Sequence, residues 1–292
     1  MPERIKVLKT YKIFIDGKFP RTESGRYFQI KSNNIPIANI CLSSKKDLRN
    51  AVVAARKAFH PWSEKTAYNR SQILYRIAEM LESRKTQFLD ELLIQGVSKK
   101  VANKEIERSI DRIIYFAGWA DKINQVFGAV NPVATSHFNF TLLEPVGVVG
   151  LLSSDESPLL GLVSAIIPVI VSGNTCVVVA SEKYPLSSIS FAEVISNSDV
   201  SSGVINILTG SKKELEPPMS LHMDINALGI FSENFDKQLF VNATENLKRI
   251  TSFNDVQINN DDFESPYVIK NFMEAKTTWH PIEVDFTKSS SY

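Results

Sequence analysis

Residues 146–180 read VGVVGLLSSDESPLLGLVSAIIPVIVSGNTCVVVA, and this stretch decides the fold. Its two short apolar runs, VGVVGLL at 146–152 and TCVVVA at 175–180, are typical of strands that are buried on both faces. The apolar residues 159–171 between them are helix-like and lead into a turn-forming Ser-Gly-Asn sequence at 172–174. The pattern therefore predicts a buried strand, a buried helix and a second buried strand.

The segment from Leu159 to Ala180 carries no charged residue and is long enough to span a bilayer. However, Pro168 and the turn at 172–175 interrupt it, and the residues that follow the turn are mostly β-branched valines. Because a membrane helix would not change its pattern in this way, we predict a buried helix followed by a strand, and no membrane partner.

The same alternation of apolar strands and helices continues toward residue 250. GVINILTG at 203–210 and INALGIF at 225–231 are strand-like, and helices are predicted at 187–196 and 235–249. Strands that alternate with helices indicate a parallel sheet covered on both faces. We predict an α/β fold with a Rossmann-like parallel sheet.

The residues before this array predict hairpins and helices. Asp16-Gly17 within YKIFIDGKF is a hairpin signal, and an N-cap at Ser43 or Ser44 opens a helix on which Leu48 and Val52 share one face. Two longer helices are expected, and Gly96 is the predicted stop of the first. The expected ranges are strands at 27–30, 37–41 and 137–143, and helices at 66–95 and 99–124.

The residues after 250 are more polar. We predict a loop or linker at 251–265, a helix at 267–275 and a strand at 277–284. The predicted domain organisation is a main unit at 1–250, with 130–145 in a small β arm, then the linker, and then a C-terminal helix and strand at 266–292.

Composition excludes several classes of protein. The 292 residues carry 33 Lys+Arg against 32 Asp+Glu, so no charge excess favours nucleic acid or a membrane surface. The two cysteines form neither a disulfide framework nor a zinc cluster, and the first residues lack the apolar core of a signal peptide. These features predict a cytoplasmic protein.

Candidate site residues follow the predicted strands, because parallel sheets bind ligands at the carboxyl ends of their strands. Glu182, next to Ser181, could accept hydrogen bonds from ribose hydroxyls, or could be a solvated charge at a helix N-terminus. Gly210 could allow close backbone approach, or could be an ordinary strand exit. The Asp155-Glu156 pair could perform acid–base or metal chemistry, or could form an exposed polar turn.

The remaining reactive side chains predict no catalytic centre. Cys176 lies within an apolar strand and Cys41 ends a short strand with no histidine nearby, so both are expected to be inert. The four histidines are far apart in sequence and show no metal-binding spacing.

Several motifs together resemble the aldehyde dehydrogenase superfamily. The cofactor-binding half of that family is similar to EPVGVVGLLSS at 144–154, GNTCVVVASE at 173–182 and GVINILTG at 203–210. IDGKF at 15–19 and the two helices that follow resemble its N-terminal region. FMEAKTTWHPI at 272–282 resembles its C-terminal strand, which in the family belongs to an oligomerisation arm that joins a neighbouring subunit's sheet.

The departures from the family pattern concern its chemistry. The resemblance places Glu156 where the family has an oxyanion-binding Asn, Val179 where it has a ribose-contacting Lys, and Phe253 at its general base. Phe231 and Glu233 would add bulk and charge where the family faces the cofactor diphosphate. After residue 252 the chain passes almost at once to the arm strand, so the resemblance implies that the catalytic domain, with its thiol, is absent.

The resemblance therefore implies a pseudoenzyme with no catalytic residue. Ser181, Glu182 and Gly210 would be vestigial cofactor-binding residues, with weak NAD(P) binding or none. The arm would join a second copy or a complete aldehyde dehydrogenase. One alternative is an NAD(P)-dependent aldehyde oxidoreductase that is active only with a partner subunit. Another is a decaying gene product, although the intact apolar patterns and the in-frame terminal strand oppose it.

Overall fold

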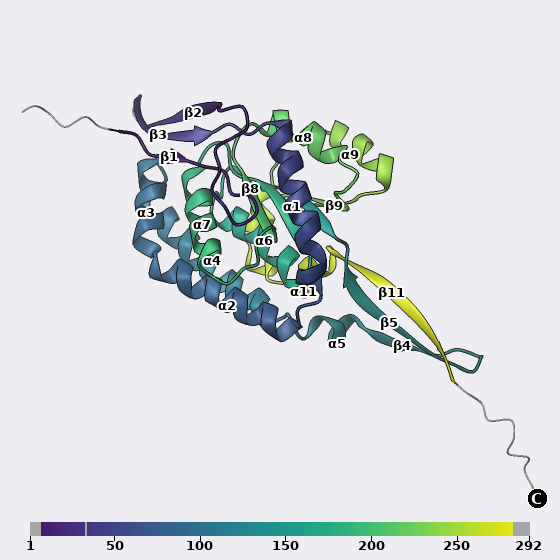
Figure 1. The fold of residues 1–292 in the computed structure, drawn as a ribbon. Helices are drawn as coiled ribbons and strands as arrows, with labels where there is room; N and C mark the ends of the chain where they lie inside the picture. The colour runs from purple at the N-terminus through teal and green to yellow at the C-terminus, as the bar shows by residue number, and fades with distance from the viewer. Residues whose placement is uncertain (1–6, 33, 283–292) are drawn as a thin grey trace, which may run out of the picture.

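A five-stranded parallel sheet forms the centre of the molecule (Figure 1), in a computed structural model that describes residues 7–32 and 34–282. The predicted α/β, Rossmann-like fold is confirmed, and every neighbouring pair of strands in this sheet runs parallel. In spatial order the strands are β10 (Arg249–Ser252), β9 (Ala227–Ile230), β6 (Val148–Leu152), β7 (Thr175–Val179) and β8 (Ile205–Leu208).

The stretch 146–180 folds as its pattern predicts. All residues of β6 and β7 are buried, and so is every residue of the helix between them, α6 (Leu160–Val171). The helix is apolar on all sides because the sheet lies on one side of it and two further helices, α2 (Ala67–Ser83) and α4 (Lys99–Ala117), pack on the other. In the part of the chain that the structure describes, no helix could cross a membrane.

The start of α6 is stabilised from a neighbouring element. The helix has no side-chain cap of its own, and Glu105 of α4 accepts hydrogen bonds from the backbone N–H groups of Leu159 (2.8 Å) and Leu160 (3.0 Å). Burial raises the pKa of the Glu105 carboxyl to about 7. This buried acid thereby fixes the helix that follows the turn between β6 and α6.

The other face of the sheet is covered by helices that lie far apart in sequence. α1 (Lys45–Ser63) begins after Ser44, one of the two predicted N-caps, with a capping box to Asp47. α8 (Lys212–Ser220) was not predicted, and it contains two prolines, Pro217 and Pro218. α9 (Gln238–Ala243) covers the β10 side of this face.

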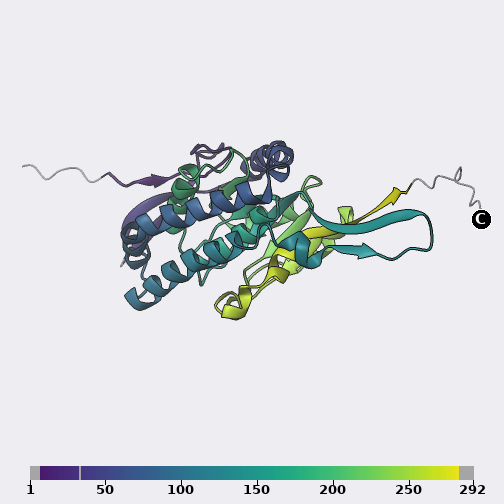
Figure 2. The same ribbon diagram turned by 90° about the horizontal axis from the view of Figure 1, so that it is seen from below.

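The helices on the α6 side, which can be followed in Figure 2, are shorter than predicted. The single helix expected at 66–95 is two helices, α2 and α3 (Lys85–Ile94), because Arg84 leaves helical geometry between them. The helix expected at 99–124 ends at Ala117, and α5 (Ile123–Phe127) follows as a separate turn. Gly96 ends α3 with a positive φ of 98°, as predicted. α7 (Leu186–Ser196) completes this layer.

A small N-terminal sheet packs beside β8. It contains β1 (Thr10–Tyr11), β3 (Ile35–Cys41) and β2 (Tyr27–Ser32) in that spatial order. Asp16 and Gly17 both have positive φ and form the predicted tight turn, with Ile15 bridged to Lys18. The hairpin extends no further, because Phe14 pairs with Ile207 of β8 instead.

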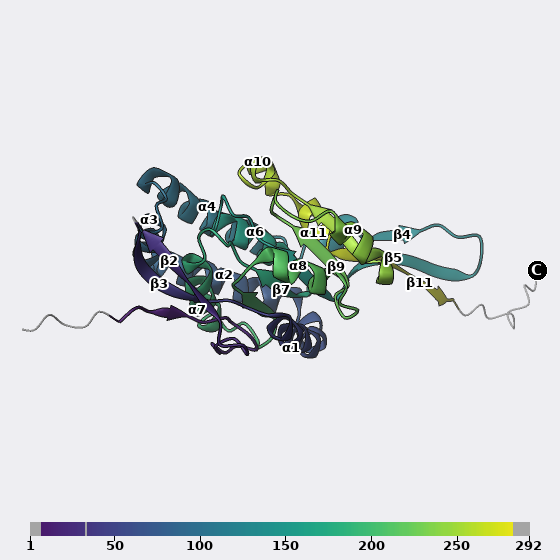
Figure 3. The same cartoon turned by 90° about the horizontal axis from the view of Figure 1, so that it is seen from above.

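A three-stranded antiparallel sheet projects from the rest of the molecule (Figure 3). It consists of β4 (Ala129–Asn131), β5 (His137–Pro145) and β11 (Met273–Pro281), and β5 lies in the middle. We call this sheet the arm. We call the central sheet, its covering helices and the N-terminal sheet the body. The helix predicted at 267–275 is only α11 (Pro266–Lys270), and the strand begins at Met273 rather than 277, because Met273 already pairs with Pro145.

The chain between α9 and the arm also differs from the prediction. The helix expected at 235–249 ends early, because a 3-10 turn (Thr244–Asn246) is followed by Leu247 with a positive φ of 55°. Arg249 to Ser252 then form β10, so the first residues of the expected 251–265 loop belong to the central sheet. The rest of that segment contains a helical turn, α10 (Asp255–Ile258), and a 3-10 turn (Asp261–Phe263).

Candidate cofactor-binding edge

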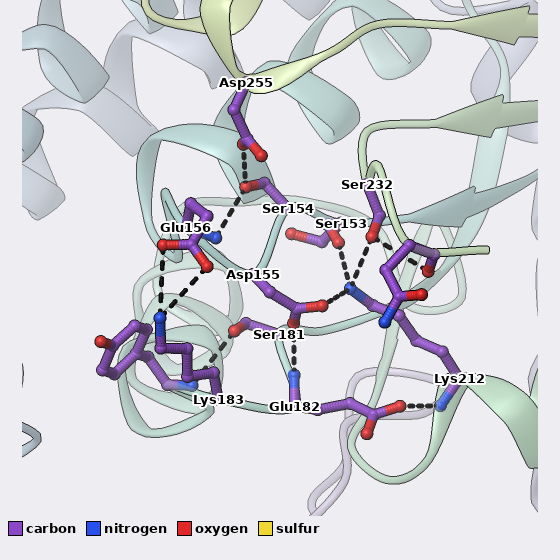
Figure 4. A network of polar contacts seen from close by, with 12 residues as sticks. Ser153, Ser154, Asp155, Glu156, Ser181, Glu182, Lys183, Lys212, Ser232 and Asp255 are labelled. Carbon is purple, nitrogen blue, oxygen red and sulfur yellow. Dashed lines mark hydrogen bonds and ion pairs between the residues drawn. The ribbon is translucent and has the colours of Figure 1, made fainter.

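The loops that follow the parallel strands meet at the carboxyl edge of the sheet (Figure 4). Asp155 comes from the loop after β6, Glu182 from the loop after β7 and Lys212 from the start of α8. Ser232 follows β9 and Asp255 follows β10. This edge is where ligands bind in open parallel sheets, so its side chains form the candidate site.

Lys212 is the central cation of this edge. Its buried ammonium donates hydrogen bonds to Ser153 O (2.6 Å), Asp155 Oδ2 (2.6 Å) and Ser232 Oγ (3.4 Å). These acceptors belong to the loops after β6 and β9, so the lysine links two parts of the edge. Sequence reasoning did not select Lys212, although its place two residues after the strand-exit glycine was an available signal.

The Asp155-Glu156 pair does not act as a pair, because the two side chains bond to different lysines. Asp155 binds Lys212 and also accepts the backbone N–H of Glu182 at 2.8 Å. Glu156 binds Lys183 through both of its oxygens, at 3.1 and 3.3 Å. Within residues 7–32 and 34–282, no cluster of His, Cys, Asp and Glu could hold a metal ion. The structure therefore favours the polar-turn interpretation of this pair.

Ser154 organises the turn before α6. Its Oγ accepts the backbone N–H groups of Glu156 (3.1 Å) and Ser157 (3.0 Å) and donates to Asp255 Oδ1. Burial raises the pKa of Asp255, and the carboxylates of Glu233 and Glu156 raise it further, whereas the Ser154 hydrogen bond lowers it. The edge is therefore rich in negative charge on its β10 side.

The structure brings two of the three predicted residues, Ser181 and Glu182, to this edge. Ser181 is buried, and its Oγ accepts the backbone N–H of Tyr184 at 3.1 Å. Glu182 is exposed, and its carboxylate accepts the backbone N–H of Lys212 at the first position of α8. Both side chains therefore perform local capping, while Glu182 also faces the neighbouring cavity.

Gly210 faces the protein rather than the cavity. It has a positive φ of 143°, and a Cβ atom at this position would lie 2.9 Å from the backbone nitrogen of Ser43. The close backbone approach expected of this glycine is therefore made to the loop between β3 and α1.

A cavity of about 470 Å³ opens beside Glu182. It is lined by Asp155, Glu182, Ser211, Lys212, Lys213, Glu216, Asn234, Phe235 and Asp236. The Glu182 carboxylate could accept ribose hydroxyls, but four carboxylates face only two lysines, and Asp155 already binds one of these. Since like charges repel strongly where solvent is limited, this lining does not fit a diphosphate.

Phe231 does not reach that cavity. It is fully buried, and its ring centroid lies 5.2 Å from that of Phe253 and 6.3 Å from that of Phe263. The expected bulk at Phe231 therefore lies in the protein interior, where the aromatic rings exclude water. Glu233, by contrast, is exposed at the edge as a negative charge.

Neither thiol is exposed to solvent at the carboxyl edge. Cys41 and Cys176 are both buried, and burial raises the pKa of the Cys176 thiol well above its ordinary value. The chain has no other cysteine.

Comparison with known proteins agrees with this architecture. The model of the aldehyde dehydrogenase family matches residues 27–252. The chain is 32% identical over 276 residues to an aldehyde dehydrogenase of Aspergillus niger, covering 89% of this chain and 55% of that protein. It is also 32% identical over 262 residues to aldehyde dehydrogenase 1A1 of Gallus gallus, covering 86% and 51%. The chain belongs to the aldehyde dehydrogenase family.

A solved structure shows the same relation. The NAD+ complex of an aldehyde dehydrogenase from Bacillus cereus superposes with a TM-score of 0.79 at 26% identity, over 84% of this chain and 51% of that one. The chain thus spans about half the length of the relatives that it matches.

Proposed function

We propose that this chain is an aldehyde dehydrogenase-like pseudoenzyme, a non-catalytic scaffold or partner subunit. One observation carries the proposal: residues 253–272 lead from β10 directly to the arm strand and pack against α4 and α6. The domain assignment that we propose is a unit at 1–250, a linker at 251–265 in place of a catalytic domain, and a C-terminal helix and oligomerisation strand at 266–292. Residues 251 and 252 at the start of this linker complete strand β10 of the unit. A cytoplasmic location is part of the same proposal.

The side chains at the edge support the absence of catalysis. Aldehyde oxidation through a covalent intermediate needs a nucleophile, oxyanion donors and a base. Both cysteines are buried, Glu156 is a carboxylate held by Lys183, and Phe253 packs against Phe231 and Phe263. Ser181, Glu182 and Gly210 would then be vestigial, and NAD(P) binding would be weak or absent because the cavity lining is acidic.

The arm supports a partner role. β11 has one edge paired with β5, and its outward residues include Trp279, which is 57% exposed. Phe138 and Leu142 of β5 are also exposed. Strands that present an open edge and apolar side chains are suited to pairing with another chain. The partner would be a second copy or a complete aldehyde dehydrogenase.

A second candidate function is an NAD(P)-dependent aldehyde oxidoreductase completed by a partner subunit. The observation in its favour is that Glu182 faces a cavity of about 470 Å³, a volume within the range of ligand sites. Titration calorimetry with NAD and NADP, together with an aldehyde oxidation assay, separates the two functions. Millimolar or undetectable binding supports the pseudoenzyme, whereas micromolar binding with turnover supports the oxidoreductase.

Association provides the second test. The chain is co-expressed with a full-length aldehyde dehydrogenase from the same cell and purified through a tag on one subunit. Recovery of a mixed complex, or sedimentation of the chain alone as an oligomer, supports the scaffold function. A monomer at micromolar concentration that recovers no partner contradicts it.

A further inference from the structure

A groove between α1 and α8 lies away from the carboxyl edge and the arm. In Figure 1, α8 lies at the top of the molecule, while the arm projects to the lower right. The groove has a volume of about 750 Å³ and runs between the first turns of α1 and the last turn of α8. It is lined by Lys45, Lys46, Leu48, Arg49, Pro217, Pro218, Leu221, His222 and Met223.

The apolar part of this groove is open to solvent. Leu221 is 48% exposed and Met223 is 65% exposed, and Pro217 and Pro218 lie beside them on the same helix end. Single exposed apolar residues are common, but a hollow in which several are gathered marks an interaction site. Methionine adds adaptability, because its flexible side chain packs against differently shaped partners.

The polar part of the groove is positively charged. None of the described residues that line it is acidic. Lys46 binds Glu23 at 2.8 Å, whereas Lys45 and Arg49 have no carboxylate within ion-pair distance among residues 7–32 and 34–282. The positive end of the α1 dipole adds to this field.

The pKa of His222 is affected by the same positive charges. Burial lowers its pKa, and the nearby cations Lys248, Arg49 and Arg56 lower it further, against the opposing charge of Asp224. The groove therefore combines an apolar surface with two cations, Lys45 and Arg49, that form no ion pair with the described part of the chain. Its complement is an apolar surface flanked by carboxylates.

We propose that this groove docks an acidic amphipathic peptide segment of a partner protein. The apolar side chains of the segment pack on Leu221, Met223 and the prolines, and its carboxylates bind Lys45 and Arg49. A peptide fits better than a small amphipathic anion, because pockets for small ligands enclose most of the ligand, whereas here the apolar side chains are half exposed. The docking of an amphipathic helix into an apolar groove is an established mode of recognition.

The probe for this proposal is a fluorescein-labelled 14-residue peptide of Leu, Ala and Glu, with Leu at helical spacing and Glu beside it. Its binding is followed by fluorescence anisotropy at low and at moderate salt. We expect saturable binding that weakens with salt, and binding at least about tenfold weaker for the same peptide with Lys in place of Glu. The K45E/R49E double variant should bind the acidic peptide more weakly than the unmodified protein, by a similar factor.

Two further variants control for the position and for the apolar part. Lys57→Glu reverses an exposed charge of α1 that does not line the groove, and should leave binding within about twofold. L221S/M223S keeps the cations and removes apolar surface, and should also weaken the binding of the acidic peptide. Thermal melting of each variant verifies the fold, so that lost binding is read only from folded proteins.

Two results with the peptides overturn the proposal: no saturable binding up to millimolar peptide, or equal binding of the Glu and Lys peptides. Equal effects of K57E and K45E/R49E on binding overturn it as well. So does saturable binding of dodecanoate, a small amphipathic anion, if K45E/R49E abolishes that binding. A change in the sedimentation of the protein alone on K45E/R49E would assign the groove to a second copy and would also overturn it. None of these outcomes depends on the arm, so they are separate from tests of the proposed function.

Discussion

The central sheet and the arm are built from strands with opposite surroundings, and the two long arm strands, β5 and β11, have nine residues each against four or five in the central strands. Every residue of β6, β7, β8 and β9 is buried, whereas most residues of β11 are exposed. The central strands are held by apolar burial on both faces, while the arm depends on backbone pairing and a few exposed contacts. The comparison teaches that the central strands have both faces covered within the chain, whereas the arm keeps exposed surface, which under the proposed function would contact a partner.

The side-chain contacts of the arm are of a kind that contributes little. Lys276 binds Glu144 across the strands at 3.0 Å, and Thr277 bonds to Thr141 at 2.8 Å, both in exposed positions. Such exposed pairs contribute about 0–1 kcal/mol each. The strength of the body and the weakness of the arm can each be tested by substitution.

The largest effect is expected at Arg112, in the body. Its fully buried guanidinium donates to Ser164 Oγ (2.6 Å) and Ile258 O (2.8 Å), and burial lowers its pKa only to about 10, so it is charged at neutral pH. Arg112→Ala should reduce the free energy of unfolding by about 3–5 kcal/mol, because it leaves buried acceptors unpaired. Urea denaturation measures the loss.

Arg108 is the matched control for that prediction. It lies one turn earlier on α4 and holds the same segment through Asn259 O (2.5 Å) and Asp261 (2.7 Å), but its side chain is 15% exposed. Arg108→Ala should cost about 1–2 kcal/mol. If the two alanine variants lost equal free energy of unfolding, burial of the arginine would not be the reason for the larger effect expected at Arg112.

The second prediction concerns pH and Glu105. The pKa of its carboxyl is about 7 in the folded chain, above the ordinary 4.5. Between pH 4.5 and 7 the folded chain therefore keeps a proton on Glu105 that the unfolded chain has released. Stability should therefore fall by about 3 kcal/mol as pH rises from about 4.5 to 7, and then change no further through this group.

Glu105→Gln tests this dependence, because the amide oxygen can still accept the N–H groups of Leu159 and Leu160. The unfolding free energy of the variant, measured by urea at several pH values, should lose this slope. Glu107→Gln, on the exposed face of α4, should keep it. A slope that survives in E105Q would mean that other groups produce it.

The third prediction tests the arm. Trp279→Glu should weaken association by at least about tenfold, because a charge would have to be desolvated in the contact, while the unfolding free energy changes by less than about 1 kcal/mol. Sedimentation velocity measures the association of the chain with itself or with the complete enzyme. Val101→Glu, at 53% exposure on α4 against 57% for Trp279, should change neither quantity. An unchanged association of W279E would remove the arm from the proposed interface.

The smallest effect is expected at Leu247, which is exposed like the arm but lies at the end of the α9 segment. Its φ of 55° is left-handed, a conformation that costs a residue with a Cβ atom about 1–2 kcal/mol, and its side chain is 87% exposed and gains no burial in return. Leu247→Gly should raise the unfolding free energy by about 1 kcal/mol, measured as a higher melting temperature. A lower melting temperature would show that the exposed leucine is held by packing after all.

Prediction from the sequence succeeded where the burial of an element requires a regular pattern of apolar residues. The strands around 148–152 and 175–179 are apolar throughout because both of their faces are covered, and helix α1 keeps its apolar spacing and its Ser44 cap. It failed where a single residue ends an element, as at Arg84 and Leu247, because backbone geometry at one position leaves no periodic signal. Strand β10 was missed because its edge position leaves it half exposed.

The sequence by itself determined the α/β class, the family and the apolar strands, because hydrophobic burial must be encoded residue by residue along the chain. Only the tertiary structure decided the roles of the polar residues at the carboxyl edge. Lys212 pairs with Asp155, Gly210 faces Ser43 and Phe231 turns inward, and each contact joins loops that are distant in sequence. Since the partner of a polar group depends on which loops the fold brings together, that information appears only once the chain has packed.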